Sequence, residues 1–372
     1  MGKCRVVEYL EGSLSDGGAE TLVKDYALML NKDKFDVSIV VDWIIPDSAN
    51  YLRLKDSGVD IISLYPRCSV FWRAVNKFFR EQYIDLAIKR TLKRIKPDVL
   101  HIHLSALHHV VDAGHCLDGV RLFYTCHSIP RVYFDARPKE YISAKRLKEE
   151  RGLRFIALHS AMAEEINKKF SIHDTEVIKN GIDLQKFRYP SKTRSEVRRS
   201  IGIDDDVFLI GNIGRFSEVK NHRFLVDVFQ MVLKKEHKAR LLLVGKGELE
   251  EEIREYIRKK GLCDKVVILS SRTDIPEILS SLDVFVVPSL FEGLSIVSIE
   301  AQAVGIRSVL STGVPSEAYV SNLAIPLSLD EPLETWCDVI LDRNMRSSFP
   351  DRLEEYDMKK EIHHLENLYL SK

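Results

Sequence analysis

The sequence of 372 residues lacks a membrane-length apolar run and an excess of charge of either sign. No apolar run approaches the roughly 18 residues of a membrane-spanning helix, and the N-terminus has no apolar core typical of a secretory signal. Lys plus Arg and Asp plus Glu number 55 each, which argues against the basic surface that a nucleic-acid partner would need. We therefore expect a cytoplasmic protein that does not bind nucleic acid.

The cysteines and histidines also do not occur in the spacings that are typical of metal sites. Six cysteines are scattered without a Cys-x-x-Cys pair, so we expect reduced, packed thiols rather than a zinc site or a disulfide framework. His101 and His103 are two residues apart in a strand-like run and therefore share one face. Two imidazoles without a third ligand or a carboxylate nearby are interpreted as a lining rather than a metal site.

The chain length favours two domains, and short β-rich runs alternate with helical patterns as in a parallel sheet wrapped by helices. In the first half we expect helices at 19–30 and from Ser160, and strands at 5–10, 37–41, 59–64, 98–104, 120–126, 155–158 and 176–179. The polar stretch 184–199, which contains Pro190, is interpreted as a linker. The rhythm then restarts, with helices expected at 221–234, 248–259 and 295–304, and strands at 208–214, 240–245, 266–269, 284–287 and 308–311.

Two consecutive arrays of this kind predict an α/β protein of two open sheets that face each other. Ligands of such sheets bind beyond the carboxyl ends of the strands, so the expected site is a cleft between the arrays. No Gly-x-Gly-x-x-Gly turn follows the first strand of either array, which argues against a dinucleotide-dependent dehydrogenase.

Two cations follow the first strand of the second array, in the segment Gly214-Arg215-Phe216-Ser217-Glu218-Val219-Lys220-Asn221. Cations at the carboxyl end of a strand, beside the N-terminus of the next helix, suit a diphosphate. Arg215 can bind it with two donors, and Lys220 can act as a point charge that stabilises the leaving group. On spacing alone, an exposed turn with solvated charges remains an equal alternative.

A second group of polar residues follows the apolar run Val284 to Val287, in the segment Pro288 to Glu300. Ser295 is a candidate N-cap, and the free N–H groups of Leu294 to Val297 would point at an anion. Glu292 precedes the helix and Glu300 lies on its second turn, so one carboxylate can face a donor sugar while the other reaches ribose hydroxyls. The alternative is a helix-terminus carboxylate and an exposed helix residue.

Taken together, these segments resemble the family-4 retaining glycosyltransferases of the GT-B fold. The resemblance rests on the Glu-x7-Glu stretch, the Gly-Arg-x4-Lys-Asn loop, Asn180-Gly181-Ile182-Asp183 and Gly17-Gly18-Ala19-Glu20. It runs from Val6 to the last helix. The stretch from Ser311 to Trp336 is similar to a branch that builds capsular polysaccharides and exopolysaccharides.

The resemblance implies two Rossmann-like domains across a deep cleft, with a C-terminal helix that crosses back to the first. The expected domains are 1–183 together with about 356–372, on the acceptor side, and 184–355, which binds the nucleotide sugar. It implies a retaining hexosyltransferase that needs no metal or other cofactor. Asp204-Asp205-Asp206, which resembles an Asp-x-Asp metal motif, is accordingly interpreted as turn carboxylates.

The resemblance also implies a role for each matching residue. Arg215 and Lys220 would bind the diphosphate, and Gly293 and Leu294 would offer backbone donors near it. Glu300 would hold the ribose hydroxyls and Glu292 the hydroxyls of the transferred sugar. Gly17 and Gly18 would let the first loop approach the phosphates and acceptor. His127, at a strand end in Thr125-Cys126-His127-Ser128, would contact and align the donor sugar; a histidine satisfied within its loop is the alternative.

One basic, aromatic stretch bears on the acceptor. Between Tyr65 and Lys96 there are nine Lys or Arg and only two acidic residues, Glu81 and Asp85. In the same stretch apolar residues recur at near-helical spacing, namely Phe71, Trp72, Val75, Phe78 and Phe79. Such a helix can lie on anionic lipid at the inner membrane face, which suits a lipid-linked saccharide acceptor. A surface helix whose aromatics pack on the sheet is an equally open interpretation.

The expected function is the transfer of a hexose from a nucleotide diphosphate sugar, with UDP as the favoured nucleotide, to a saccharide or lipid-linked acceptor. Two alternatives stay open. One is a nucleotide-sugar epimerase or glycogen-type phosphorylase of the same architecture. The other is a catalytically silent subunit that scaffolds a polysaccharide assembly complex.

Overall fold

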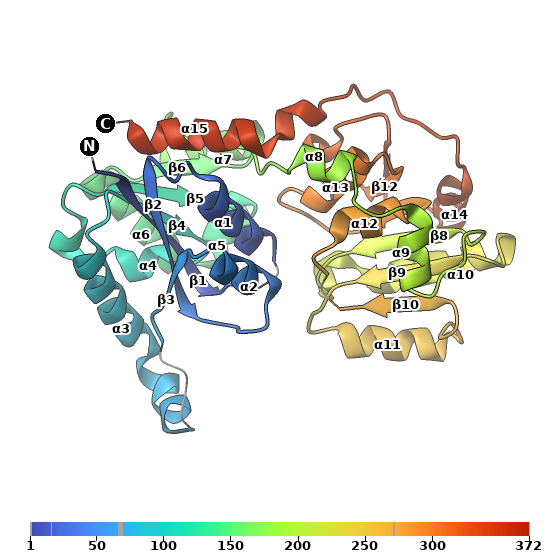
Figure 1. Ribbon diagram of the computed structural model, residues 1–372, viewed down its shortest axis with the longest axis horizontal. Helices are drawn as coiled ribbons and strands as arrows, with labels where there is room; N and C mark the ends of the chain where they lie inside the picture. Colours follow the sequence, from blue (N-terminus) through green and yellow to red (C-terminus); the bar gives the residue numbers. More distant parts are fainter. Residues whose placement is uncertain (1, 16, 66–69, 271, 372) are drawn as a thin grey trace. The chain divides into compact units, whose positions relative to one another are not determined.

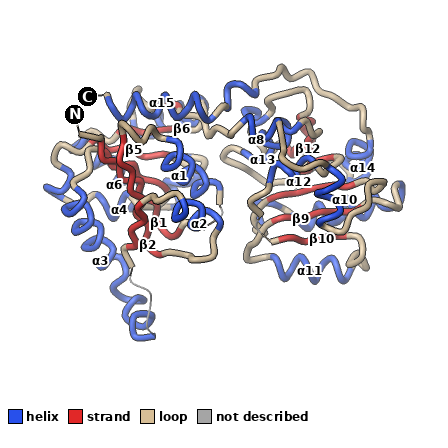
Figure 2. Tube along the Cα trace, in the orientation of Figure 1, coloured by secondary structure: helices blue, strands red, loops and turns tan. Residues whose placement is uncertain are grey.

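A computed structural model describes residues 2–15, 17–65, 70–270 and 272–371. The chain divides into two units, Met1–Asn180 with Lys359–Lys372 (unit 1) and Gly181–Met358 (unit 2). Each unit holds one parallel sheet with helices beside it, as the strands and helices of Figures 1 and 2 show. The expected fold of two Rossmann-like βα arrays is therefore confirmed.

Unit 1 contains a seven-stranded sheet of order β3-β2-β1-β4-β5-β6-β7. Its strands are β1 (Cys4–Ser13), β2 (Phe35–Trp43), β3 (Asp60–Ser63), β4 (Val99–His103), β5 (Arg121–Thr125), β6 (Arg154–Ala157) and β7 (Glu176–Val177). Its helices are α1 (Gly18–Met29), α2 (Ala49–Asp56), α3 (Val70–Ile95), α4 (Leu107–Val110), α5 (Pro130–Ala136), α6 (Pro138–Arg151) and α7 (Ser160–Phe170). Strands β1 and β4 pair in parallel with Glu8 opposite His101.

Unit 2 contains a six-stranded sheet of order β10-β9-β8-β11-β12-β13. Its strands are β8 (Leu209–Ile213), β9 (Arg240–Val244), β10 (Val266–Leu269), β11 (Val284–Val287), β12 (Ser308–Ser311) and β13 (Ala324–Leu327). Its helices are α8 (Leu184–Arg188), α9 (Arg194–Ser200), α10 (His222–Lys235), α11 (Glu250–Lys259), α12 (Ile275–Ser280), α13 (Ile296–Val304) and α14 (Leu333–Leu341).

The strands of unit 2 are apolar on both faces, and each face builds a core of its own. On one face Phe285 and Val287 pack with Phe187 and Ile299, from α8 and α13. On the other face Val284 and Val286 pack with apolar residues of α10, α11 and α14, including Phe229, Ile257 and Trp336. Because successive side chains of a strand alternate between faces, a run such as Val284–Val287 must be covered twice.

The expected linker is wrong. Residues 184–188 form α8 and residues 194–199 form most of α9 instead, and Leu184, Phe187 and Val197 are buried in the core of unit 2. A capping box explains the start of α9: the Thr193 side chain accepts from the Glu196 N–H, and the Glu196 carboxylate accepts from the Thr193 N–H.

The last helix, α15 (Met358–Leu370), belongs to unit 1 from Lys359 onward. The expected apolar stripe is confirmed, because Ile362, Leu365, Leu368 and Tyr369 are all buried. The Glu366 carboxylate accepts the Asn31 N–H at 2.8 Å. The C-terminal segment is thus an integral part of a unit whose other residues end at Asn180.

Candidate functional site

In each sheet the chain order reverses between two neighbouring strands, β1 and β4 in unit 1 and β8 and β11 in unit 2. Loops that leave the carboxyl ends of two such strands go to opposite faces, which opens a crevice at that edge. The residues singled out in the sequence follow these strands or their neighbours: Gly17 and Gly18 after β1, His127 after β5, Arg215 and Lys220 after β8, and Glu292 after β11.

In unit 2 the structure brings Lys220 and Glu292 together. Lys220 Nζ lies 2.5 Å from Glu292 Oε1, and the Ser289 hydroxyl donates to the same oxygen at 2.6 Å. The Lys220 side chain is 19% exposed and that of Glu292 12%. The Leu290 N–H also donates to the Val219 carbonyl at 2.8 Å, so the two loops are held to each other by backbone and side chains. A cation with several donors therefore stands beside a carboxylate acceptor at the switch point.

Arg215 is not part of this pair. Its side chain is 73% exposed, and its Nε donates to Glu248 Oε2 at 3.0 Å, in the segment after β9. Within the described ranges no ion pair or hydrogen bond joins Arg215 to Lys220 or Glu292. Arg215 is thus an accessible guanidinium next to the pair in sequence, held by an exposed carboxylate.

The start of α13 differs from the expectation in two details. Ser295 is the residue before the helix, but its side chain caps no backbone N–H and instead accepts the Ser298 hydroxyl at 2.7 Å. The Ile296 N–H donates to the Leu294 carbonyl at 3.1 Å, so the four N–H groups from Leu294 to Val297 are not all open to an anion. Gly293 is partly exposed in the turn before the helix, and Glu300 is half-buried on the helix itself.

Three glycines that the sequence analysis did not single out hold these loops close together. A Cβ on Gly245 would lie 2.0 Å from the Gly214 carbonyl oxygen, and Gly245 has φ +152°. A Cβ on Gly247 would lie 2.3 Å from the Phe216 carbonyl oxygen, and one on Gly313 would lie 2.3 Å from that of Leu290. Two glycines two residues apart, Gly245 and Gly247, directly after a strand could have predicted this close approach of two loops. Backbones come this close only where a side chain is absent.

In unit 1 the two glycines after β1 differ from each other. A Cβ on Gly17 would lie 2.4 Å from Glu20 Oε2, whose carboxylate folds back and accepts the Ser15 hydroxyl at 2.6 Å. Nothing lies within 4 Å of a Cβ on Gly18. Of these two glycines, therefore, only Gly17 is crowded, and the crowding atom is the end of a side chain.

His127 lies two residues beyond β5 and is hydrogen-bonded to a buried cluster. Its Nε2 is 3.0 Å from His103 Nδ1, and His103 Nε2 is 2.8 Å from Glu8 Oε2. Burial, and then the charges of His103 and His101, lower the pKa of His127 well below its usual range. The interpretation of His101 and His103 as having no carboxylate nearby is thus wrong: Glu8, from β1, lies against both.

Glu8, His101 and His103 offer ligand atoms within 4.8 Å of one another, which makes them a candidate metal group. The distances fit hydrogen bonds better. Two ligands of one tetrahedral zinc ion, each about 2.0–2.1 Å from the metal, lie about 3.3 Å apart. His103 Nε2 and Glu8 Oε2 are only 2.8 Å apart, and Glu8 Oε1 also accepts the Tyr369 hydroxyl at 2.8 Å.

The Asp204–Asp206 run lies in turns before β8. Asp206 pairs with Lys238 at 2.5 Å, and the Arg198 guanidinium donates to the carbonyls of Asp204 and Asp205. This segment is thus at the amino end of its strand, away from the edge that carries Lys220.

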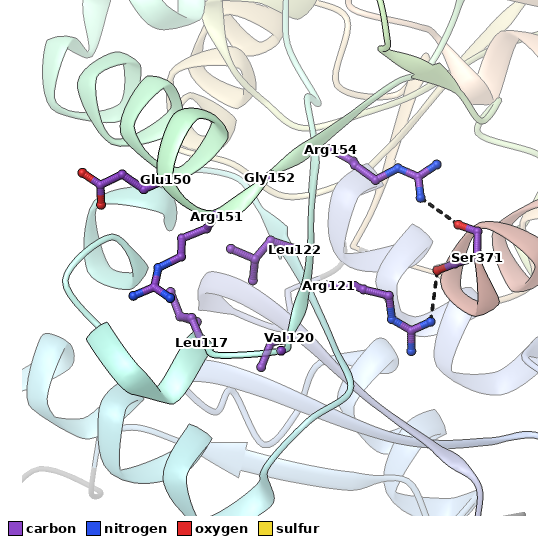
Figure 3. A pocket seen from close by; sticks show the side chains of 10 residues that line it. Leu117, Val120, Arg121, Leu122, Glu150, Arg151, Gly152, Arg154 and Ser371 are labelled. Carbon is purple, nitrogen blue, oxygen red and sulfur yellow. Dashed lines mark hydrogen bonds between the residues drawn. The ribbon is translucent and has the colours of Figure 1, made fainter.

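A cavity of about 490 Å³ also lies at an amino-terminal edge, beside the starts of β5 and β6. Figure 3 shows its lining residues. The cavity is lined by Arg121 and Arg154, at the starts of β5 and β6, and by Arg151. Their guanidiniums already donate: Arg121 to the Ser371 carbonyl, Arg154 to the Ser371 hydroxyl, and Arg151 to Asp118. The cavity is therefore basic in composition, but its cations are engaged and it is remote from the strand ends that carry the candidate residues.

The basic stretch from Tyr65 to Lys96 is only partly described. Arg67 lies outside the described residues, as do the side chains of Phe71, Trp72, Arg73, Val75, Lys77 and Phe78. The described part of α3 buries Ile84, Ile88 and Leu92 and exposes basic residues, namely Arg80, Arg90, Lys93 and Arg94. Phe79 and Leu86 are exposed apolar residues, at 62% and 47%. Among the described helices, none is long and apolar enough to cross a membrane.

Comparison with known sequences gives two family matches in succession. Residues 16–186 match Glycosyltransferase Family 4, and residues 193–323 match Glycosyl transferases group 1. EpsF of Bacillus subtilis (strain 168), named as a glycosyltransferase, is 34% identical over 201 residues, 52% of either chain. The UDP-Gal:alpha-D-GlcNAc-diphosphoundecaprenol alpha-1,3-galactosyltransferase of Escherichia coli is 26% identical over 248 residues, 64% of this chain and 63% of that protein.

These alignments span between half and two thirds of the two relatives' own lengths. Among solved structures, Anabaena HepE in complex with UDP and glucose superposes with a TM-score of 0.75, 17% identity and 98% of both chains covered. At that identity the superposition establishes a shared fold.

Proposed function

Because the chain belongs to the glycosyltransferases that join a family-4 domain to a group 1 domain, we propose that it transfers a sugar from a nucleotide diphosphate sugar to another saccharide. The single observation that carries this proposal is the Lys220–Glu292 pair at the switch point of unit 2. A diphosphate requires fixed positive charge, and a sugar requires hydrogen-bond acceptors for its hydroxyls; the pair supplies both within one ion-pair distance.

Each candidate residue takes a role that its surroundings permit. Lys220 and Arg215 neutralise the diphosphate, whose charge grows as the bond to the sugar breaks. Glu292 accepts from hydroxyls of the transferred sugar, and Glu300 accepts from the ribose. Gly293 and Leu294 donate backbone N–H groups to the phosphates, and Gly17 and Gly18 keep the loop after β1 thin beside donor and acceptor. His127 contacts the donor sugar.

The donor is a UDP-sugar and the acceptor a saccharide or lipid-linked saccharide in capsule or exopolysaccharide assembly. HepE binds UDP and glucose, and the Escherichia coli relative is named for UDP-Gal and a diphosphoundecaprenol acceptor, which supports both choices. Transfer proceeds with retention and without a metal ion, as the family resemblance implies.

A panel of nucleotide sugars tests the donor. The purified chain is melted with UDP-, GDP- and ADP-sugars, with and without EDTA, since a bound donor raises the melting temperature by mass action. We expect stabilisation by a UDP-sugar, unchanged by EDTA, followed by release of UDP when a saccharide acceptor is added. Stabilisation by no nucleotide sugar would favour the scaffold alternative, and conversion of the donor to its epimer would favour the epimerase.

The exposed face of α3 favours peripheral contact with the inner membrane face. Each exposed cation near an anionic surface contributes about 1 kcal/mol, and Phe79 and Leu86 add apolar area beside them. The protein should therefore co-sediment with vesicles of anionic lipid at low salt, and it should not co-sediment with neutral vesicles. The variant Arg90→Gln/Lys93→Gln/Arg94→Gln should lose this binding but keep donor binding. Equal sedimentation of variant and parent would exclude α3 as the contact.

A further inference from the structure

A row of hydrogen-bonded side chains runs through the core of unit 1 from α15 to the segment after β5. It comprises Tyr369, His101, Glu8, His103 and His127, and we call it the histidine chain. The Tyr369 hydroxyl donates to Glu8 Oε1 at 2.8 Å and lies 2.5 Å from His101 Nδ1. Glu8, His101 and His103 are fully buried, and His127, half-buried, is the member that reaches the edge of the unit.

The protons of the histidine chain follow from its distances. Burial opposes ionisation of Glu8, but the charge and hydrogen bonds of His101 and His103 outweigh it and lower its pKa to about 2. Burial, and then the charge of His101, lower the pKa of His103 to about 4. Near pH 7 Glu8 is thus an acceptor only, and neutral His103 must carry its one proton on Nε2, 2.8 Å from that carboxylate.

This leaves His103 Nδ1 with a lone pair, so the contact at 3.0 Å requires His127 Nε2 to be the donor. Neutral His127 then has an unprotonated Nδ1, which hydrogen-bonds to no other described residue. We propose that Glu8, acting through His103, holds His127 in the Nε2–H tautomer and so leaves Nδ1 to accept a hydrogen bond from a hydroxyl of the transferred sugar. This inference rests on the proposed function, because it needs a sugar donor at His127.

A consequence for specificity follows from the fixed tautomer. An acceptor-only nitrogen binds a sugar hydroxyl that donates, and it rejects a sugar in which hydrogen or fluorine replaces that hydroxyl, because neither can donate. With a free imidazole the ring could present either an acceptor or a donor. Glu8 and His103 are therefore positioning residues, and His127 is the group that touches the substrate.

The variant His103→Leu tests the inference because it removes the acceptor for His127 Nε2–H. His103→Asn is the conservative partner, since its side-chain oxygen can accept near the position of Nδ1. His109→Leu is the matched control: His109 is buried in the same unit and hydrogen-bonded to a carboxylate, Asp85, at 2.7 Å, but it lies outside the histidine chain.

The tautomer of His127 is read first, in the full chain, by nitrogen NMR of 15N-histidine-labelled protein, with His127→Asn identifying the signals. We expect protonated Nε2 and bare Nδ1 in the parent, in His103→Asn and in His109→Leu, and a mixture of tautomers in His103→Leu. A single Nδ1–H tautomer in the parent would overturn the inference, as would one equivalent of tightly bound zinc found in the purified chain.

The second readout is release of UDP from UDP-glucose, or from whichever nucleotide sugar stabilises the chain most, and from its deoxyfluoro analogues. His103→Leu should lower kcat/KM about 10- to 100-fold and lose discrimination against one analogue, while His103→Asn recovers part of both. Affinity for UDP alone should not change. If the parent binds no nucleotide sugar, the proposed function fails. If it binds one and His103→Leu matches the parent in tautomer and rate, only the present inference fails.

Discussion

The Lys220–Glu292 pair should be energetically coupled far more strongly than the neighbouring Arg215–Glu248 pair. Both pairs join loops at the carboxyl edge of the same sheet, so both report on unfolding of unit 2. They differ in exposure: the side chains of the first pair are 19% and 12% exposed, and those of the second 73% and 54%. The comparison thus varies burial while holding the location and the charge types nearly constant.

Burial sets the expected size of each coupling. Exposed pairs contribute about 0.2–1 kcal/mol, whereas removal of one partner from a buried pair costs about 3–5 kcal/mol. Lys220 and Glu292 are neither fully buried nor solvated, and the Ser289 hydroxyl would still donate to Glu292 in the absence of Lys220. We therefore expect a coupling of about 2 kcal/mol for this pair, and about 0.5 kcal/mol or less for Arg215–Glu248.

Two double-mutant cycles measure these couplings by urea denaturation at low salt: Lys220→Met with Glu292→Gln, and Arg215→Met with Glu248→Gln. Unfolding is followed by a signal confined to unit 2, because two units need not unfold together. The coupling of the exposed pair should vanish in 1 M salt, while that of Lys220–Glu292 should largely persist. A coupling for Lys220–Glu292 no larger than that of the exposed pair would refute the argument that this ion pair is an organised part of the site.

Further outcomes follow from the same contacts. Glu300→Ala or Arg215→Ala should abolish sugar transfer while leaving circular dichroism and melting temperature near those of the parent; normal turnover in either would contradict its assignment. The stability of unit 1 should fall as the pH is lowered from 6.5 to 5, because the folded pKa values of His103, about 4, and of His127 lie below the unfolded value and the unfolded chain binds the extra protons. His103→Leu should remove the share of His103, about 1.6 kcal/mol over this range, and leave that of His127 in urea titrations. Deletion of residues 359–372 should lower the melting temperature of unit 1 by many degrees in calorimetry, since Leu365 and Tyr369 are fully buried there. An unchanged melting temperature would mean that α15 is dispensable.

The sequence predicted the strands of unit 2 well because their apolar runs are continuous and bounded by turn residues. The bounds expected for 266–269, 284–287 and 308–311 match β10, β11 and β12. The helices at α8 and α9 were missed because each presents too few turns for a periodic pattern. Thr193-x-x-Glu196 nevertheless matches a capping box at the start of a helix. The polar composition of the stretch favoured the interpretation as a linker instead.

In the candidate site, single residues could be predicted from the sequence but their contacts could not. Lys220 and Glu292 were predictable singly, from loops after strands, but their contact depends on β8 and β11 being neighbours, which periodicity does not reveal. The same holds for Glu8. It is one of two carboxylates in β1, and only the pairing of β1 with β4 sets it opposite His101, 93 residues later. Side chains that meet through strand order leave no local signal.

The histidine chain is better understood as a cost to the fold than as a source of its stability. Glu8 is ionised in a fully buried position, and the pKa of His103 is lowered well below that of a free imidazole, so that His103 is neutral. A buried charge is tolerated only when its partners are complete, and replacing such a set with apolar side chains of similar volume is often neutral or stabilising. An apolar core at β1 and β4 would therefore fold at least as readily. Such a core would not fix the proton of His127 on Nε2. The fixed proton is what leaves Nδ1 to accept a hydrogen bond from a sugar hydroxyl.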